Sequence, residues 1–315
     1  MGNVLVVVEQ LNGKTGEITF EMLGKGRELA SALGGELHAL VIGGQADELG
    51  IADKVWVMGD GALAHYTSAN HKAALVAAIS AISPRVTLIG NTSIGMDLAA
   101  GASAATGIPL IAYCNALRVE GGQVVGTSQI YGGKVLAEVA PEDGACIVSV
   151  LAGAFPASAG RSDKTPVLET LAPPALDNRV RFVRLIEPEA ADVDITKAAV
   201  VVSVGRGIQS ADNIELADGL ADALGGVVGA SRPVTDAGWL PKSRQVGKSG
   251  LRVKPKLYLA LGISGAPEHL EGMKDSGLII AINQDASAPI FDVAHYGVVG
   301  DLFEIVPALT EKIKG

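Results

Sequence analysis

Along residues 4–113 the hydrophobic positions alternate between short unbroken runs and longer segments with helical spacing. The runs consist mainly of Val, Leu and Ile, which is typical of strands buried on both faces of a parallel sheet. Predicted strands cover 4–8, 37–42, 55–58, 86–89 and 109–113, and predicted helices cover 19–33, 68–82 and 96–105. This alternation predicts a doubly wound α/β domain.

After residue 120 the strand-like runs follow one another without a helical segment between them. These runs cover 124–126, 130–133, 135–139 and 146–151, and a last one covers 180–186. We expect the runs before residue 152 to form antiparallel strands that extend the first sheet. The acidic stretch 187–194 has no strand pattern and predicts the connection to a second domain. The predicted domains are therefore 1–188 and 189–315.

From residue 199 the alternation of strands and helices resumes. Predicted strands cover 199–204, 257–261, 278–282 and 289–294, and predicted helices cover about 210–224, 267–273 and 301–313. The fold class that we predict is thus α/β, with two doubly wound domains whose sheets are mostly parallel.

Two predicted strands of the second domain are followed directly by glycine-rich turns. Gly205-Arg206-Gly207 follows the run 199–204, and Gly262-Ile263-Ser264-Gly265 follows the run 257–261. Such a turn before a helix points free N–H groups at an anion, although a single glycine turn is more often only a tight connection. Two of them on parallel strands open onto one edge of a sheet, where open α/β folds bind ligands. The pair therefore predicts a nucleotide-sized ligand.

The charge of the chain narrows the choice of partners. Its 315 residues carry a formal net charge of −9, and the acidic excess lies within residues 1–195, which argues against nucleic acid as a partner. One basic stretch, from Lys242 to Lys256, contains no carboxylate and could either hold an anion or form a solvated face. No apolar run approaches the ~18 residues of a membrane span, so direct membrane insertion is not expected.

The cysteines and the first residues bear on the compartment. Cys114 and Cys146 lie in apolar runs and outside any Cys-x-x-Cys pair, which predicts buried thiols in a reducing environment. No leader pattern precedes the first predicted strand. We therefore expect a cytoplasmic protein, or a mitochondrial matrix protein if the chain is processed.

Several polar side chains follow the predicted strands of the second domain. Arg206 and Arg232 could each bind a phosphate or place a fixed positive charge beside an electron-accepting ring. His269 could donate to a ring carbonyl, although a lone histidine is more often structural. Asn283 and Asp301 stand at a strand end and a helix start, where capping is the simpler interpretation. No Ser–His–Asp order, metal-ligand cluster or Walker lysine accompanies them, which favours a cofactor holder over a hydrolase.

Motifs of the second domain resemble those of the α (large) subunit of electron-transfer flavoproteins, in the same order over residues 198–315. They are Val204-Gly205-Arg206-Gly207, Gly229-Ala230-Ser231-Arg232 with Asp236-Ala237-Gly238, Gln245-Val246-Gly247-Lys248-Ser249-Gly250, Gly262-Ile263-Ser264-Gly265-Ala266 with His269-Leu270 and Gly272-Met273, Ala281-Ile282-Asn283, and Ala288-Pro289-Ile290-Phe291. In the first domain the resemblance rests on the architecture and the opening strand.

The resemblance implies a heterodimer in which this chain binds FAD mainly through its C-terminal domain, and the β (small) subunit contributes the other side of the groove. The first domain would be the scaffold for that subunit. The implied cofactor-binding residues are Arg206, Ser231, Arg232, Val246, Gly247, Lys248, Ser249, Ser264, Gly265, Ala266, Pro267, Glu268, His269, Asn283, Asp301 and Leu302. Arg232 would lie against the isoalloxazine, where a guanidinium favours negative charge on the flavin and raises its potential.

The same resemblance assigns the other positions to parts of the cofactor. Val246 to Ser249 would follow the flavin, Ser264 to His269 would engage the ribityl chain, a ring carbonyl and the pyrophosphate, and Asn283, Asp301 and Leu302 would hold the adenosine end. The chain departs from the family pattern in having Lys248, Ser249 and Pro267-Glu268 where Gln, Thr and Ile-Gln are usual. Because Glu268 adds negative charge near the flavin, we hypothesise that Lys248 and Glu268 together replace two neutral amides.

The implied function is that of an electron carrier and not of a substrate-converting enzyme. Electrons would pass from a flavoprotein dehydrogenase, such as an acyl-CoA dehydrogenase of fatty acid oxidation, to FAD. The C-terminal domain would then swing on the connection near 187–195 and deliver them to an acceptor, such as a membrane quinone oxidoreductase.

Three alternatives stay open. The chain could be the α subunit of an NADH-linked, electron-bifurcating flavoprotein. It could be an NAD-dependent enzyme of similar fold, which needs an acidic residue about 20 positions after the first glycine turn; the chain has Gly225-Gly226-Val227-Val228 there, and Asp222 lies slightly early. A nonredox regulatory module would instead bind AMP or ATP and show no visible colour.

Overall fold

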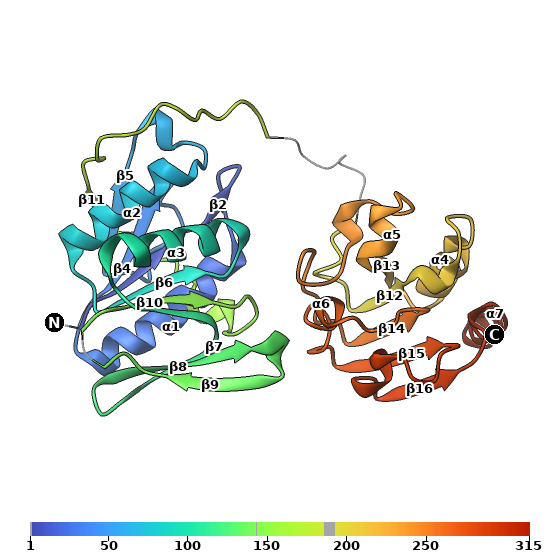
Figure 1. Cartoon of the computed structure of the whole chain (residues 1–315). Coiled ribbons are helices and arrows are strands. Elements are labelled where there is room, and N and C mark those ends of the chain that lie inside the picture. Colours follow the sequence, from blue (N-terminus) through green and yellow to red (C-terminus); the bar gives the residue numbers. More distant parts are fainter. Residues whose placement is uncertain (1, 143, 186–192) are drawn as a thin grey trace. The chain divides into compact units, whose positions relative to one another are not determined.

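The computed structural model describes residues 2–142, 144–185 and 193–315. The chain divides into two compact units, Met1–Arg184 and Leu185–Gly315, each built around its own sheet (Figure 1). The predicted domain boundary between residues 188 and 189, and most of the predicted connection 187–194, lie outside the described residues. No helix in the described part of the chain has the length and apolar character needed to cross a membrane.

The first unit contains a nine-stranded sheet with the order β11-β5-β4-β1-β6-β10-β7-β8-β9. Its strands are β1 (Val4–Val7), β4 (Leu37–Ile42), β5 (Lys54–Met58), β6 (Val86–Gly90), β7 (Leu110–Glu120), β8 (Gln123–Ile130), β9 (Val135–Val139), β10 (Cys146–Val150) and β11 (Leu168–Thr170), beside a small hairpin of β2 (Gln10–Leu11) and β3 (Lys14–Thr15). The pairs from β11 to β7 are parallel, and β7-β8-β9 are antiparallel, so the predicted antiparallel extension of the first sheet is confirmed.

Helices cover both faces of this sheet, which explains the unbroken hydrophobic runs. The helices are α1 (Glu17–Leu33), α2 (Ser68–Ile82) and α3 (Ser93–Thr106). Val4 and Val6 of β1 lie in a core with α1, whereas Leu5 and Val7 lie in a second core with α2 and α3. Successive side chains of a strand point to opposite faces, so every position of β1 is buried. The doubly wound prediction is confirmed.

Three predictions about the first unit are wrong in detail. Residues 146–151 do not extend the antiparallel ribbon, because β10 lies between β6 and β7 and is parallel to both. Residues 131–133 form a 3-10 turn and not a strand, and residues 180–185 contain no strand. The sequence pattern also missed β11, a short exposed edge strand that pairs with β5. Edge strands carry little hydrophobic signal because only one neighbour and little core contact them.

The second unit contains a five-stranded, fully parallel sheet with the order β13-β12-β14-β15-β16. Its strands are β12 (Val200–Val204), β13 (Val227–Ala230), β14 (Leu257–Leu261), β15 (Leu278–Asn283) and β16 (Tyr296–Val299), and its helices are α4 (Ile214–Ala223), α5 (Arg232–Asp236), α6 (Pro267–Leu270) and α7 (Leu302–Lys314). Cores form on both faces of this sheet, so it is also doubly wound.

The last strand of the second unit is displaced from its predicted place. Residues 289–294 were expected to be a strand, but Pro289–Asp292 forms a 3-10 helix and the strand is Tyr296–Val299. Proline has no N–H to donate to a sheet and favours the first turn of a helix. The remaining 3-10 helices are Gly61–Leu63, Ala157–Gly160, Arg206–Ile208 and Lys242–Arg244.

Candidate functional site

The sequence-predicted site residues of the second unit gather at the carboxyl edge of its parallel sheet. At least one of them lies at or just after the end of each strand. They are Arg206 after β12, Ser231 and Arg232 after β13, Ser264, Gly265, Ala266, Pro267, Glu268 and His269 after β14, Asn283 as the last residue of β15, and Asp301 and Leu302 after β16. Because all five strands are parallel, these positions share one edge (Figure 1). This edge is where open α/β sheets bind ligands.

The remaining predicted positions, 246–249, reach the same edge through backbone hydrogen bonds. The Val246 N–H donates to the Ala230 carbonyl at the end of β13 (2.8 Å), and the Lys248 N–H donates to the Glu268 carbonyl in α6 (2.7 Å). Gly247 has φ +139°, and a Cβ there would lie 2.8 Å from the Glu268 carbonyl oxygen. Only glycine fits between these segments, so the loop is held between the ends of β13 and β14.

The two glycine turns touch each other at the point where the strand order reverses. The chain runs from β12 outward to β13, then crosses back to β14 on the other side of β12. The Gly207 N–H donates to the Gly262 carbonyl (3.1 Å), and a Cβ on Gly207 would lie 2.7 Å from the Gly262 Cα. Gly262 itself has φ +60°. The prediction that both turns open onto one edge is confirmed, and they meet at the topological switch point of the sheet.

The dimensions of the edge match an extended ligand. Four strand spacings of about 4.8 Å separate β13 from β16, so the edge is about 19 Å long. A mononucleotide at the switch point would contact only the turns after β12 and β14. Residues distributed over all five strand ends suit a ligand with two ring systems joined by a chain.

The exposed side chains along this edge are of mixed charge. Arg206, Arg232, Lys248, Ser249, Ser264 and Glu268 are exposed. The Arg232 side chain, 67% exposed, donates from Nε to Asp236 (3.1 Å), so a neighbouring carboxylate orients its guanidinium. Arg232 is the first residue of α5 and its Ser231 neighbour is the buried N-cap. The edge therefore presents one oriented and exposed guanidinium, that of Arg232.

Three of the predicted residues also have structural roles. The Asn283 amide donates to the Ile263 carbonyl (2.8 Å) and accepts from the Asp285 N–H (3.0 Å), which ties the ends of β14 and β15 together. Asp301 caps α7 by accepting from the Phe303 N–H (2.9 Å). Leu302 is buried in the core. The capping interpretation is confirmed for Asp301, whereas Asn283 caps no helix and instead holds the turn after β15.

His269 is buried and neutral, and one of its nitrogens is unpartnered. Its Nε2 lies 2.9 Å from the Tyr258 hydroxyl, while Nδ1 is buried and has no hydrogen-bond partner of good geometry among the described residues. Burial lowers the pKa of His269 to about 4, although the nearby Val246 carbonyl opposes that shift. An unpaired buried polar atom costs free energy unless a ligand or water completes it.

The sequence analysis missed two residues that support this site. Tyr258 is fully buried in β14 and holds His269. Gln245 is buried too; it accepts from the Thr235 hydroxyl (2.8 Å) and donates to the Ser249 hydroxyl (3.0 Å). The available signal was a tyrosine inside an otherwise aliphatic strand, because a buried hydroxyl needs a polar partner. No group of three or more potential metal ligands occurs within residues 2–142, 144–185 and 193–315.

Comparison with known proteins agrees with this geometry. Residues 4–176 match the family model described as "Electron transfer flavoprotein domain", and residues 194–274 match "Electron transfer flavoprotein FAD-binding domain". The chain is 37% identical to the electron transfer flavoprotein subunit alpha of Thermoanaerobacterium thermosaccharolyticum, over 99% of this chain and 98% of that protein. It is 38% identical to the subunit alpha of Syntrophomonas wolfei (100% of both chains) and 34% identical to that of Bacillus subtilis (100% and 98%).

These matches span nearly the whole chain and cover both of its units. The FAD-binding model falls on the unit whose sheet edge carries the two glycine turns and the Arg232–Asp236 ion pair. A subunit designated alpha implies a β subunit as its partner. The chain belongs to the electron-transfer flavoprotein α-subunit family, and its second unit is the FAD-binding domain of that family.

Proposed function

We propose that this chain, paired with a β subunit, holds FAD along the carboxyl edge of its second sheet and carries electrons from a dehydrogenase to a separate acceptor. The observation that carries the proposal is the contact between the two glycine turns at the switch point, with candidate side chains at the end of every strand. FAD, when bound, accepts electrons from one protein and releases them to another.

The residues along this edge fit the chemistry of FAD. Glycine turns allow a pyrophosphate to approach the backbone N–H groups closely, and Arg206 supplies a cation beside them. The unpartnered Nδ1 of His269 would be completed by a ring carbonyl. In this proposal the Tyr258 hydroxyl donates to Nε2, so the one proton of the neutral imidazole resides on Nδ1 as a donor.

Arg232 and Ser249 would act on the flavin ring. The Arg232 guanidinium, oriented by Asp236, would favour negative charge on the ring and so raise its affinity for electrons. The Ser249 hydroxyl accepts from the Gln245 amide, which leaves its own proton for a nitrogen of the ring. These roles, like the contacts of Val246, Gly247, Lys248 and the 264–269 segment, rest on the resemblance and on the position of each residue at the edge.

Co-expression with the β subunit tests the proposal directly. We expect a yellow heterodimer whose visible absorption has flavin bands, and which releases FAD on denaturation. Arg232→Ala should lower the midpoint potential of the bound flavin, whereas Glu304→Gln, an exposed change on α7, should leave it unchanged. A correctly assembled heterodimer that stays colourless and does not take up added FAD would contradict the proposal.

The pairing of Lys248 with Glu268 is tested by the same potential. The two residues are joined through the backbone, since the Lys248 N–H donates to the Glu268 carbonyl. Glu268→Gln removes a negative charge near the flavin and should raise the midpoint potential, because reduction adds negative charge to the ring. A potential identical to that of the unmodified heterodimer would refute the hypothesis.

The donor and the acceptor are proposed from the redox chemistry of FAD and from the name of one relative. We propose a flavoprotein dehydrogenase, such as an acyl-CoA dehydrogenase, as the donor, and a membrane quinone oxidoreductase as one acceptor. A relative of 35% identity from Anaerotignum propionicum is named "Acryloyl-CoA reductase electron transfer subunit beta", which makes an acyl-CoA-linked reductase a second type of partner. The heterodimer is mixed with a dehydrogenase and its substrate, and reduction of the flavin is measured by the loss of its visible absorption. This distinguishes a dehydrogenase donor from the other proposed partners.

An NAD-dependent enzyme is disfavoured by the end of β13. The acidic residue that binds ribose in such enzymes stands at the end of the second strand, and here that place holds Ala230 and Ser231. The bifurcating alternative predicts oxidation of NADH by the heterodimer, which the same spectrum would reveal. A cytoplasmic location stays a prediction, with which two buried unpaired cysteines, Cys114 and Cys146, are consistent.

A further inference from the structure

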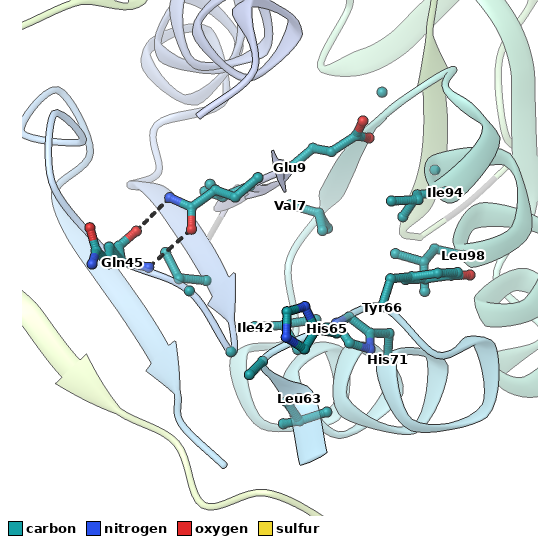
Figure 2. Close-up of a pocket in the computed structure, with 18 of the residues that line it drawn as sticks. Val7, Glu9, Ile42, Gln45, Leu63, His65, Tyr66, His71, Ile94 and Leu98 are labelled. Carbon is teal, nitrogen blue, oxygen red and sulfur yellow. Dashed lines mark hydrogen bonds between the residues drawn. The ribbon is translucent and has the colours of Figure 1, made fainter. Parts of the chain in front are cut away.

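A cavity lies at the carboxyl edge of the first sheet, far in sequence from the FAD domain. It has a volume of about 370 Å³ and is lined by the ends of β1, β4 and β6 together with residues 63–66, His71 and the start of α3 (Figure 2). β1 lies between β4 and β6. After β1 the chain runs to β4 and β5 on one side and then crosses to β6 on the other side of β1. The cavity is therefore at the switch point of the first sheet, and it is large enough for a small ligand.

One part of the cavity is apolar and aromatic. Its aliphatic residues are Val7, Ile42, Leu63, Ile94 and Leu98, and its ring-bearing residues are His65, Tyr66 and His71. Burial lowers the pKa of His71, so this ring is neutral at physiological pH. The His65 ring is stacked on Phe182 with centroids 3.8 Å apart, which holds it in place before any ligand binds. Such a surface suits a flat heterocyclic ring.

The opposite part of the cavity is polar, and Figure 2 shows Glu9 toward one end and the three ring-bearing residues toward the other. The Gln10 amide is already engaged, because it donates to the Gln45 carbonyl (2.6 Å) and accepts from the Gln45 N–H (3.0 Å). A Cβ on Gly44 would lie 1.9 Å from that amide oxygen, so the wall is closely packed. Gln10 is therefore not available to a ligand, and Glu9 is the carboxylate among the described residues that line the cavity.

One oxygen of the Glu9 carboxylate accepts a hydrogen bond from a described residue of the chain, and the other does not. Its Oε2 accepts from the Thr92 hydroxyl (2.5 Å), and within the described part of the first unit its carboxylate has no second hydrogen bond, which leaves Oε1 for a ligand. Burial raises the pKa of Glu9, since the carboxylate has lost water that a hydroxyl donor would replace. Among the residues that the structure describes, no Lys or Arg lines the cavity. A phosphate would find a like charge there and no cation.

We propose that this cavity is a second ligand site that binds an uncharged nucleoside, with the base against the apolar and aromatic residues and the ribose hydroxyls on Glu9. An ionised carboxylate only accepts hydrogen bonds, so Glu9, two residues after the end of β1, can accept from the two hydroxyls of a ribose diol. A nucleoside combines a flat ring with two vicinal hydroxyl donors, which matches the two parts of the cavity. The site is independent of the FAD edge, because all its residues belong to the first unit.

The test is isothermal titration of the FAD-loaded heterodimer with adenosine, guanosine, cytidine and uridine. For the nucleoside that binds, the 2′,3′-dideoxy form and the 5′-monophosphate are titrated as well. The protein variants are Glu9→Gln, which removes the charged acceptor, and Ile94→Phe, which fills the cavity. Glu169→Gln is the matched control, since Glu169 is exposed on β11 and does not line the cavity.

We expect at least one nucleoside to bind with 1:1 stoichiometry. Glu9→Gln should weaken it about ten-fold or more, as expected for loss of hydrogen bonds to a charged group. Ile94→Phe should abolish binding, Glu169→Gln should not change it, and the dideoxy and monophosphate forms should bind more weakly.

Three results would overturn the proposal. One is that none of the four nucleosides binds at millimolar concentration. Another is that affinity is unchanged in both Glu9→Gln and Ile94→Phe, because the nucleoside then binds elsewhere in the heterodimer. The third is that the monophosphate binds more tightly than the nucleoside. If Glu9→Gln does not fold, the Ile94→Phe variant and the dideoxy comparison decide the question alone.

Discussion

The hydrogen bond between Tyr258 and His269 allows a sharp test of how the FAD domain is built. Tyr258→Phe removes one oxygen from a fully buried side chain and leaves its packing unchanged. His269 Nε2 then loses its partner, in a ring whose Nδ1 is already unpartnered. A buried polar group left unsatisfied costs about 1–3 kcal/mol. We therefore expect the free energy of unfolding of the second unit to fall by about that amount.

Urea unfolding followed by tryptophan fluorescence measures this change in each unit separately. The chain has 2 tryptophans, and one lies in each unit: Trp56 in the first and Trp239 in the second. In a Trp56→Phe background, Trp239 reports the second unit alone. A loss of about 2 kcal/mol corresponds to a midpoint shift of about 1 M urea. Tyr296→Phe is the control, because Tyr296 is exposed and its change should cost less than about 0.5 kcal/mol.

The same variant tests the proposed proton position on His269. If Tyr258 fixes the tautomer that donates from Nδ1, Tyr258→Phe should also weaken FAD binding, about ten-fold for each 1.4 kcal/mol lost. Equal stability and equal FAD affinity in Tyr258→Phe and the unmodified heterodimer would refute the reasoning. A loss of stability with unchanged FAD affinity would keep the structural role of the pair and refute its role toward the flavin.

The stability of the second unit should also depend on pH through His269. The pKa of this residue is about 4 in the folded protein and 6.5 in the unfolded chain. Between these two values the unfolded chain binds a proton that the folded protein does not, so stability is lost as the pH falls from 6.5 to 4. The full effect is roughly 3 kcal/mol, and a His269→Gln variant should show a flatter dependence of the Trp239 midpoint between pH 7 and pH 4.5. Gly262→Ala should destabilise the second unit by about 2 kcal/mol or more and reduce FAD binding, because its φ is +60° and its Cβ would lie 2.7 Å from the Gly207 Cα. Gly219→Ala in α4, where the new Cβ meets no atom within 4 Å, should be neutral or stabilising; equal effects of the two alanines on urea midpoints would contradict the close-approach argument. Glu21 accepts from the N–H groups of Gly153 and Phe155, so Glu21→Gln should cost the first unit about 1–3 kcal/mol by Trp56 fluorescence, while Glu169→Gln should cost nothing measurable.

The site was predictable from the sequence to the extent that its signals are local. A buried strand followed by Gly205 or by Gly262 predicts a turn at the carboxyl edge of a parallel sheet, and the turns lie there. Supporting contacts were not predictable in this way. Gln245 and Ser249 are close in sequence and lie in one loop, but the Thr235 hydroxyl that completes their hydrogen bonds comes from α5. Nothing in the spacing of these residues indicates that their side chains meet.

The order of the strands in the sheets also could not be predicted from the hydrophobic pattern. Residues 146–150 have the pattern of a buried strand, and that pattern is satisfied equally well beside β8 or between β6 and β7. Residues 289–294 and 296–299 are both apolar enough for a strand, and Pro289 decides against the first because it cannot donate a ladder hydrogen bond. Hydrophobic pattern reports burial, and it does not identify the neighbour that provides it.

By itself the sequence of this protein determined two α/β units and, in the second unit, two glycine turns that each follow a buried strand. These features depend on periodicity and on backbone conformations that only glycine and proline select, which are properties of adjacent residues. The tertiary structure alone decided that β10 lies within the first sheet, that Tyr258 holds His269, and that a cavity with one carboxylate opens at the switch point of the first unit. Those features arise from contacts between segments distant in the chain, where packing and hydrogen-bond satisfaction choose among partners that the sequence pattern leaves equivalent.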